Sequence, residues 1–428
     1  MKAVILAAGR SFRMKPIEDK NFISFCGVML VEHQIKMLRQ AGLKEIVLVG
    51  GAHNLERLKA VAKKMKCEVV EQKELDLGMA GAVLSAKSFI KGEPFLLVSS
   101  NDVLEISAYK KVLLQAKKKT SALLAKKVTE YFPGGYLSVD KKNQITGIVE
   151  KPGAGKEPSD LVNMVVHYHA DSKALLVALE KVSSDKDDRY ERALQSLFDE
   201  GLSYVAVPYD GYWQPVKFPW HIIDLMMHFL PRTGTTVRKG KNVTIAKSAV
   251  IRGPVVLADG VRVFDNAVIQ GPAYIGKNSI IANGALVRGS HVGTDCVIGF
   301  GSEIARSYVG DHVWTHTNYV GDSVIGNNVS FGSGTVTGNL RLDEGQIVCT
   351  VKGEKIGAGR NKLGLITGDN IRVGVNTSFM PGIKVGSNCF IGAGITVAQD
   401  IEDGMFVTGE HTLKIRPNRE KIPVRKPL

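Results

Sequence analysis

The segment Leu6–Lys20, which reads LAAGRSFRMKPIEDK, resembles a loop that grips the phosphates of a nucleotide. Such a loop follows a short apolar strand and brings bare backbone N–H groups close to the phosphates, which glycines make possible. One glycine of the pattern is missing here, and the side chain of Phe12 is expected to obstruct the approach. The segment therefore predicts phosphate chemistry, but it leaves open whether a nucleotide is still transferred.

Composition sets the size and class of the protein. The 428 residues are 44% hydrophobic and 23% charged, which suits two domains with ordinary cores. The formal net charge is +14, and basic residues gather in the C-terminal tail TLKIRPNREKIPVRKPL. This tail fits a solvated terminus, a site for an anion such as coenzyme A or a sugar phosphate, or nucleic acid, and its charge alone does not choose among them.

Cysteines and apolar runs indicate the compartment. The five cysteines include no C-x-x-C pair, so neither a disulfide framework nor a zinc site is expected. We find no signal-peptide pattern and no run of about 18 apolar residues. We therefore expect a cytoplasmic protein that does not span a membrane.

Residues 1–231 alternate strand and helix patterns. The strand patterns AVIL, EIVLVG and FLLVSS are separated by amphipathic helix patterns such as VMLVEHQIKMLRQAG. This succession predicts an α/β, Rossmann-like domain with a parallel sheet wrapped by helices. Ligands are then expected beyond the carboxyl ends of the strands.

Residues 236–428 follow a different rule, because aliphatic residues recur every six positions. Val263, Ile269, Ile275, Ile281 and Val287 show this spacing, and many apolar residues precede glycine. A triangular coil of parallel strands needs one inward aliphatic per side, so the repeat predicts an all-β left-handed parallel β-helix. The repeat breaks at about 341–366, which predicts a projecting arm. Coils of this type usually assemble as trimers, so we expect a homotrimer or a dimer of trimers.

Together these features resemble the sugar-1-phosphate nucleotidylyltransferases joined to a hexapeptide-repeat acetyltransferase, as in the bifunctional enzymes that make UDP-N-acetylglucosamine, especially the archaeal ones. In the first domain the resemblance implies binding of a nucleoside triphosphate and a sugar phosphate, with Mg²⁺ as a candidate ion on Asp102. The residues that match the nucleotide and sugar-phosphate motifs are Ala8, Gly9, Arg13, Lys20, Gln72, Gly78, Glu150, Lys151 and Asn163.

Three segments of this domain depart from the family pattern, at four positions. Ser11 and Phe12 replace the loop glycine and threonine, Met79 replaces a threonine of the base-recognition segment, and Pro215 stands where the family has a second metal-binding aspartate. Proline offers no side-chain oxygen to a metal ion. These departures predict a weakened or altered nucleotidylyltransferase domain, in which Lys217 is a candidate replacement cation.

In the second domain, WTHTNYVGDSVIGNNVSFGSGTVTGNLR resembles the acetyltransferase segment of the family. The resemblance implies His316 as the base that takes a proton from the amino-sugar nitrogen as it attacks acetyl-CoA. Tyr319 would bind a sugar hydroxyl or phosphate, and Asn339 would donate to the oxyanion or hold the sugar. Residues of the later turns imply an acetyl-CoA cleft, namely Asn376, Ser378, Gly392 and Ala393.

One mismatch concerns the sugar phosphate. Archaeal relatives carry lysines just after the N-L-R triplet, whereas this chain has Asp343 and Glu344 there. Four cations further along the arm are candidate replacements, namely Lys352, Lys355, Arg360 and Lys362.

The leading hypothesis is acetyl-CoA-dependent N-acetylation of an amino-sugar-1-phosphate, with glucosamine-1-phosphate as the favoured substrate, by a chain whose first domain is weakened. One alternative is full bifunctional synthesis of UDP-N-acetylglucosamine or a related nucleotide sugar. The other is a non-catalytic regulatory or scaffold subunit. Nucleic acid is a disfavoured partner, because the sequence shows no interleaving of aromatic and basic residues.

Overall fold

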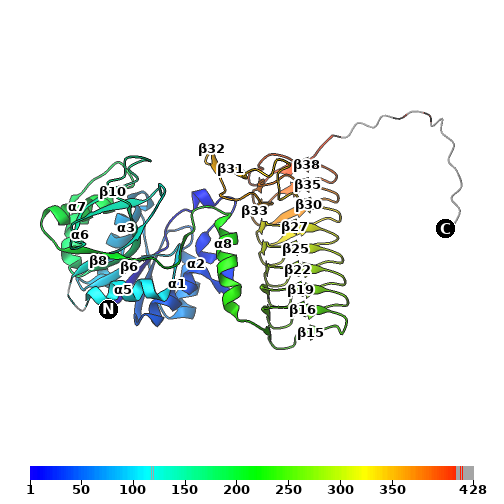
Figure 1. Cartoon of the computed structure of the whole chain (residues 1–428), viewed down its shortest axis with the longest axis horizontal. Coiled ribbons are helices and arrows are strands. Elements are labelled where there is room, and N and C mark those ends of the chain that lie inside the picture. Colours follow the sequence, from blue (N-terminus) through cyan, green and yellow to red (C-terminus); the bar gives the residue numbers. More distant parts are fainter. Residues whose placement is uncertain (117, 119, 411–414, 416, 418–428) are drawn as a thin grey trace.

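The computed structural model describes the chain except for residues 117, 119, 411–414, 416 and 418–428. Most of the predicted basic tail therefore lies outside the described residues. An α/β half and a long coil of strands lie side by side, with helix α8 (His221–Phe229) between them (Figure 1). Within the described residues, no helix is both long enough and apolar enough to cross a membrane.

The first half is built on a nine-stranded sheet in the order β10-β9-β11-β6-β1-β4-β5, with β8 beside β11 and β12 beside β8. Its centre is parallel and consists of β1 (Lys2–Leu6), β4 (Glu45–Gly50), β5 (Glu68–Glu71) and β6 (Phe95–Ser99). The strands β1 and β4 are buried on both faces, as their nearly continuous apolar sequences predict.

The rest of the sheet is not parallel throughout, which corrects the sequence prediction. This part consists of β8 (Ser121–Lys127), β9 (Gly135–Val139), β10 (Ile145–Glu150), β11 (Leu161–His169) and β12 (Tyr204–Pro208). Strand β11 runs antiparallel to β6, β8 and β9, and β9 runs antiparallel to β10. The turn 140–144 between β9 and β10 is too short for the crossover that parallel strands require.

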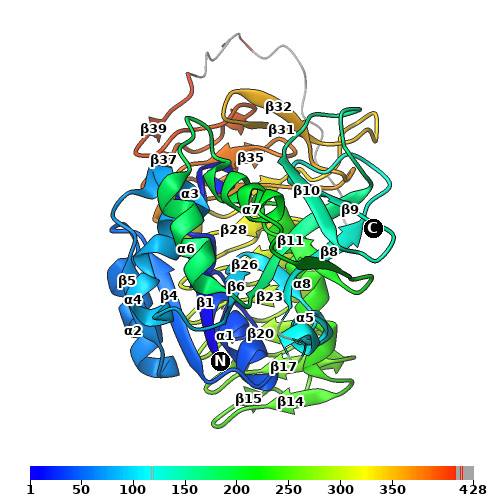
Figure 2. The same ribbon diagram turned by 90° about the vertical axis from the view of Figure 1, so that its left-hand side faces the viewer.

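Helices cover both faces of this sheet (Figure 2). They are α1 (Leu30–Gln40), α2 (Leu55–Met65), α3 (Gly78–Ser85), α4 (Lys87–Ile90), α5 (Ile106–Ala116), α6 (Ser172–Lys181) and α7 (Arg189–Asp199). Alternate residues of β1 point to opposite cores: Ile5 packs in a cluster with α1, α2 and α5, and Val4 packs in one with α3, α6 and α7. Two short ribbons complete this half, β2 (Ser24–Phe25) with β3 (Val28–Met29), and β7 (Asp102–Leu104) with β13 (Trp213–Pro215).

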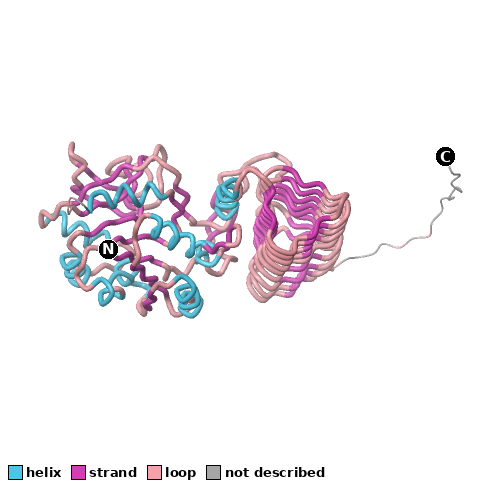
Figure 3. The backbone as a smooth tube through the Cα atoms, turned by 90° about the horizontal axis from the view of Figure 1, so that it is seen from below, coloured by secondary structure: helices cyan, strands magenta, loops and turns pink. Residues whose placement is uncertain are grey.

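The second half is the left-handed parallel β-helix, seen along its axis in Figure 3. Three parallel sheets form its sides, and the aliphatics of the six-residue repeat, Val263 to Ile304, are at most 1% exposed in its interior. The sequence prediction of this fold is confirmed.

We name the three sides by their strands. The docking sheet consists of β14 (Val237–Lys239), β17 (Val255–Leu257), β20 (Ala273–Ile275), β23 (His291–Val292), β26 (Tyr308–Val309), β28 (Val324–Ile325), β33 (Ile366–Thr367) and β36 (Lys384–Val385). The second side holds β15 (Thr244–Ile245), β18 (Arg262–Val263), β21 (Ile280–Ile281) and β24 (Val297–Ile298), then β29 (Val329–Phe331), β34 (Ile371–Val373), β37 (Phe390–Ile391) and β39 (Phe406–Val407). The third sheet consists of β16 (Val250–Arg252), β19 (Val268–Gln270), β22 (Leu286–Arg288), β25 (Glu303–Ala305), β27 (Tyr319–Gly321), β30 (Val336–Thr337), β35 (Ser378–Phe379) and β38 (Thr396–Val397).

A buried apolar cluster joins the two halves. It combines Trp220 and Met226, at the start of and within α8, with Tyr308 and Val324 of the docking sheet. The predicted arm is an antiparallel hairpin of β31 (Val348–Val351) and β32 (Glu354–Gly357), and Cys349 at its base belongs to the same cluster. The last short helix of the first half spans Pro231–Thr233, and β14 begins the coil at Val237.

Candidate active sites in the two domains

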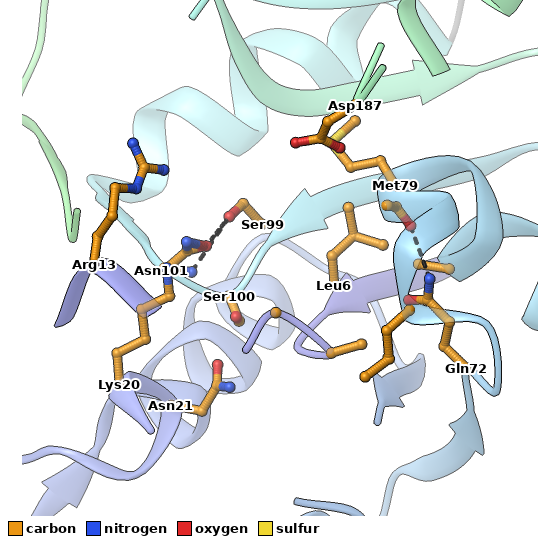
Figure 4. A pocket seen from close by; sticks show the side chains of 15 residues that line it. Leu6, Arg13, Lys20, Asn21, Gln72, Met79, Ser99, Ser100, Asn101 and Asp187 are labelled. Carbon is orange, nitrogen blue, oxygen red and sulfur yellow. Dashed lines mark hydrogen bonds between the residues drawn. The ribbon is translucent and has the colours of Figure 1, made fainter. Parts of the chain in front are cut away.

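A pocket of about 340 Å³ opens beyond the carboxyl ends of β1 and β6 (Figure 4). Six predicted nucleotide-binding residues line it, namely Ala8, Gly9, Arg13, Lys20, Gln72 and Gly78. The pocket occupies the edge of the sheet where parallel α/β folds bind their ligands. The structure thus brings the predicted loop and the predicted base segment to one cavity.

Ser11 occupies the position of the missing glycine in this loop. Ser11 takes the left-handed conformation that glycine adopts most easily, with φ 53°. Phe12 does not line the pocket, so the expectation that its ring obstructs the phosphates is wrong. Its side chain is 53% exposed and lies beside the arm, with the Lys352 ammonium 5.8 Å from the ring centroid.

Buried polar residues hold the loop from beneath. Asp19, where the bifunctional enzymes have a proline, accepts from the backbone N–H of Asn21 at 2.8 Å and from the Asn54 amide at 2.7 Å. The amides of Asn21 and Asn54 both donate to the carbonyl of Ala7, at 3.0 and 2.9 Å. This network fixes the position of Lys20, which lies between Asp19 and Asn21.

Gln72 is oriented by the loop that follows it. Its amide nitrogen donates to the carbonyls of Glu74 at 3.0 Å and Gly78 at 2.9 Å, and the residue is only 3% exposed. Its Oε1 remains available as an acceptor at the pocket. Gly78 has φ +55°, and a Cβ there would lie 2.5 Å from Asp187 Oδ1, so glycine is required at this position.

Asp102 lies in a strongly cationic surrounding. It pairs with Pro215 across the β7–β13 ribbon. Burial raises the pKa of Asp102, and the charges of Lys217 and Lys20 oppose that rise. Burial also lowers the pKa of Lys20 and of Lys217 to about 8 each. Lys217 Nζ donates to the Pro133 carbonyl at 2.8 Å, and Lys20 Nζ donates to the Val216 carbonyl at 3.3 Å.

Asp102 is the carboxylate that the family resemblance assigns to a metal ion, and Asp187 is a second carboxylate, which lines the pocket. No cluster of three or more histidine, cysteine, aspartate or glutamate side chains suited to a metal occurs in the described part of the chain. The Pro215 carbonyl already accepts from the Gln214 amide at 3.2 Å. Because Mg²⁺ is commonly held by one or two carboxylates together with substrate phosphates, Asp102 fits an ion that arrives with a triphosphate.

Three predicted sugar-phosphate residues lie around strand β9. A Cβ at Gly135 would stand 3.1 Å from Glu150 Oε2 and 3.5 Å from Asn163 Cβ, so these two side chains flank the glycine. Lys151 Nζ lies 2.9 Å from Glu150 Oε1. The predicted trio therefore forms one polar group beside the cationic site.

A buried hydrogen-bonded chain orients Asn163, and the sequence did not reveal it. His167 Nε2 lies 2.9 Å from Asn163 Oδ1, and its Nδ1 lies 2.7 Å from the Tyr190 hydroxyl. His169 Nε2 lies 3.0 Å from the same hydroxyl, and its Nδ1 lies 3.0 Å from the Tyr204 hydroxyl. Burial lowers the pKa of His167 to about 3, so the imidazole is neutral. One order of donors satisfies every member: each Nε2–H donates toward Asn163 or Tyr190, and each hydroxyl donates to an Nδ1.

On the coil, Tyr319 and Asn339 belong to one network with Asp322. The Asn339 amide nitrogen donates to the Tyr319 hydroxyl at 3.2 Å and to Asp322. Arg306 holds Asp322 with two hydrogen bonds, Nε to Oδ1 at 2.7 Å and Nη2 to Oδ2 at 2.6 Å. Since both amide hydrogens of Asn339 are engaged, its Oδ1 is the atom left for a substrate, which favours holding the sugar over donating to an oxyanion.

His316 lies on the edge between the second side and the third sheet, and it is exposed. Backbone bonds stack the later turns on this edge, because Gly334 N donates to Thr317 O, Asn376 N to Ser333 O and Gly394 N to Val375 O. The predicted acetyl-CoA residues Asn376, Gly392 and Ala393 therefore lie on the same edge as His316, and Ser378 lies on the adjoining third sheet.

The cations of the arm have different surroundings. Arg341 is paired with Asp343, and Arg360 with Asp224 of α8, so neither is left for a sugar phosphate. Lys355 Nζ donates to Thr350 Oγ1 at 3.0 Å on the hairpin. Lys362 is exposed and lies opposite Leu340, and Leu363 N donates to Asn339 O at 2.9 Å. Of the four candidate replacements, Lys362 is thus the one that backbone pairing places next to Asn339.

Other residues at the sites escaped the sequence analysis. Asn21, Asn101 and Asp187 line the first pocket, and Arg306 anchors Asp322. Asn101 directly precedes Asp102, so its place next to a predicted metal ligand could have identified it. Asp187 and Arg306 come from distant segments, and no local pattern marks them.

Comparison with known proteins covers both halves. The Nucleotidyl transferase family model matches residues 2–224, and the model for the bacterial transferase hexapeptide (six repeats) matches residues 254–289. A "Bifunctional sugar-1-phosphate nucleotidylyltransferase/acetyltransferase" of Sulfurisphaera tokodaii is 32% identical over 95% of this chain and 99% of its own length. A "Bifunctional protein GlmU" of Methanocaldococcus jannaschii is 33% identical over 95% of this chain and 97% of its own length.

Among solved structures, apo-UDP-glucose pyrophosphorylase covers 54% of this chain and 98% of its own, at 18% identity and a TM-score of 0.47. The full-length relatives are bifunctional by name, which favours the bifunctional alternative over the expectation of a weakened first domain. The chain belongs to the family of bifunctional proteins that join a sugar-1-phosphate nucleotidylyltransferase domain to a hexapeptide-repeat acetyltransferase domain.

Proposed function

We propose that this protein catalyses two reactions: N-acetylation of an amino-sugar-1-phosphate by acetyl-CoA on the coil, and transfer of a nucleotide to a sugar-1-phosphate in the first domain. Glucosamine-1-phosphate is the proposed acceptor of the acetyl group. Activity of the first domain is supported by the bifunctional relatives and by the pocket that its loop lines, and it is proposed in place of a weakened first domain.

The network of Tyr319, Asn339 and Asp322, which begins three residues after the exposed His316, carries the acetyl-transfer proposal. His316 removes a proton from the sugar nitrogen as that nitrogen attacks the thioester carbon of acetyl-CoA. Asn339 Oδ1 accepts from the sugar, and the Tyr319 hydroxyl, whose oxygen accepts from Asn339, donates its own hydrogen toward the substrate. The thiolate of coenzyme A leaves as the tetrahedral intermediate collapses.

In the first domain, positive charge gathers where a triphosphate would bind. Arg13 and Lys20 line the pocket, and Lys217 lies near Asp102. These cations stabilise charge that develops on the phosphate oxygens when the sugar phosphate attacks. Mg²⁺ held by Asp102 and the triphosphate would supply further neutralisation of that charge. The acceptor Oε1 of Gln72 suits a base that offers a ring N–H, such as uracil or thymine.

The charge that holds the sugar phosphate on the coil is assigned to Lys362. Asp343 is engaged by Arg341, so the acidic pair after Asn339 is partly neutralised. Lys362 lies on the returning strand beside Leu340 and is exposed. The Lys362→Ala variant is expected to raise KM for glucosamine-1-phosphate about tenfold, with KM for acetyl-CoA unchanged. Lys247→Ala, on an early coil, is the matched control.

The deciding experiment measures thiol release from acetyl-CoA with glucosamine-1-phosphate. His316→Ala is expected to lower kcat by about 10²- to 10⁴-fold. His312→Asn is the control, because His312 is exposed on the same coil and faces Asp295 at 4.0 Å. Absence of thiol release by the wild-type protein across several amino-sugar phosphates would contradict the acetyl-transfer proposal and favour a scaffold subunit.

Pyrophosphate release from UTP or dTTP with N-acetylglucosamine-1-phosphate tests the other reaction. Wild-type protein is expected to release pyrophosphate, and Arg13→Ala and Lys20→Ala to release it far more slowly. Both reactions are proposed for an assembled homotrimer or dimer of trimers, which sedimentation of the full chain measures.

A further inference from the structure

A second cleft, of about 700 Å³, lies between the nucleotide loop and the arm. Its walls come from three places: Phe12 and Lys15 of the loop, the hairpin from Val348 to Lys355, and the coil turns 381–384 and 398–402. Its volume is in the range of small-molecule sites. None of its lining residues lines the first pocket.

The charge of this cleft is unbalanced toward positive. Four lysines line it, Lys15, Lys352, Lys355 and Lys384, against the two carboxylates Asp400 and Glu402. Lys384 is engaged, because its Nζ lies 3.3 Å from Asp400 Oδ2 and donates to the Thr350 carbonyl. Lys15 lies 3.6 Å from Asp403. The ammonium groups of Lys352 and Lys355 have no carboxylate within salt-bridge distance in the described part of the chain, so they are available to an anion.

Phe12 adds a flat apolar surface to the same cleft. The ring is 53% exposed, which is unusual for a phenylalanine side chain. The Lys352 ammonium stands 5.8 Å from its centroid. An aromatic face next to ammonium groups that have no carboxylate partner is a combination suited to a base and its phosphates.

We propose that this cleft is a second site for a phosphate-bearing nucleotide, distinct from the pocket where nucleotide transfer is proposed. Lys352 and Lys355 would contact the phosphates, and Phe12 would stack on the base. The predicted acetyl-CoA residues Asn376, Gly392 and Ala393 lie on another edge of the coil. Those residues do not line this cleft, so binding here can be measured without either reaction taking place. Two sources share this chemistry, a nucleoside triphosphate and the phosphoadenosine end of coenzyme A.

Calorimetric titration of the full chain with UTP and, separately, with coenzyme A tests the proposal. No acceptor sugar is present, so nothing turns over. If the source is the triphosphate, wild-type protein binds two equivalents of UTP per chain, and Lys352→Ala/Lys355→Ala binds one. If the source is the coenzyme, the same variant binds coenzyme A at least tenfold more weakly. Lys241→Ala/Lys247→Ala removes the same charge from exposed positions on the early coils and is expected to match wild type.

The outcomes separate the hypotheses. Loss of one UTP equivalent, or weaker binding of coenzyme A, in the hairpin variant alone supports the site and identifies its ligand. A UTP stoichiometry and a coenzyme A affinity that are both the same in the hairpin variant as in wild type overturn it. Failure of the acetyl-transfer or pyrophosphate assays would contradict the proposed function and leave these titrations interpretable, because they measure binding only.

Discussion

Asp322 is the residue on which the geometry of the coil site most depends. It is 6% exposed, and it accepts two hydrogen bonds from Arg306 and one from the Asn339 amide. Its φ is 48°, in the left-handed region that asparagine also tolerates. Asp322→Asn therefore keeps the shape and the backbone while it removes the charge.

The expected size of the effect follows from these bonds. A hydrogen bond to a charged group contributes about 1.5–3 kcal/mol, against about 1 kcal/mol for a neutral one. Arg306 has 32% of its side chain exposed, so water recovers part of the loss on that side. Because Asn339 and Tyr319 are then less well positioned, we expect a loss of about 2 kcal/mol of transition-state stabilisation. This loss corresponds to about a 30-fold fall in kcat/KM for acetyl transfer.

The assay compares both reactions in one variant. Acetyl transfer is expected to fall, and pyrophosphate release in the first domain to stay unchanged. Asp295→Asn is the matched control, because Asp295 is an aspartate on the coil with φ 54° whose side chain is 42% exposed. If Asn339→Ala abolishes acetyl transfer but Asp322→Asn leaves it within about twofold, Asp322 does not position Asn339 and the reasoning is refuted.

Three further predictions concern the first domain. Pro215→Asp places a carboxylate opposite Asp102, so it is expected to lower the Mg²⁺ concentration for half-maximal pyrophosphate release about tenfold. Pro215→Ala is the control. An unchanged Mg²⁺ requirement would show that this position does not face the ion. Burial lowers the pKa of Lys20 and Lys217 to about 8, so both lose their positive charge above that pH, and kcat/KM for the triphosphate is expected to fall as pH rises through about 8. A profile that is flat from pH 7 to about 9.5 would exclude these ammonium groups from triphosphate binding. Tyr190→Phe leaves two buried imidazole nitrogens without a partner, so it is expected to lower the free energy of unfolding in urea by about 2–4 kcal/mol. It is also expected to raise KM for the sugar-1-phosphate. Tyr131→Phe, at an exposed position, serves as the control. Equal KM values in Tyr190→Phe and wild type would separate this network from the orientation of Asn163.

The fold of the coil could be predicted because it follows from a short repeat in the sequence. Each inward aliphatic, such as Ile269 or Val287, fills the same place one turn above the last, so spacing alone identifies the architecture. The loop that lines the first pocket could also be located, because glycine and cations in a fixed order reflect one backbone path. The same logic failed for the sheet beyond β6, where short connections, and not residue patterns, determine the strand directions.

Contacts between segments that are distant in the chain could not be predicted from the sequence. Phe12 turns outward because the arm provides a surface there, and the arm is more than three hundred residues away in the chain. Arg306 matters only because the coil brings it one turn below Asp322. The histidine chain behind Asn163 likewise unites strands and a helix that no local motif connects.

The arm contacts both halves of the chain. Asn339 is the last coil residue before the arm departs, and its carbonyl accepts from Leu363 N as the arm returns. Between these points the arm is held against the first domain by the ion pair of Arg360 with Asp224 and by the apolar cluster around Trp220 and Cys349. The first domain thus fixes both ends of the segment that presents Asn339 and Lys362. The proposed acetyl-transfer site is therefore positioned in part by the domain for which nucleotide transfer is proposed.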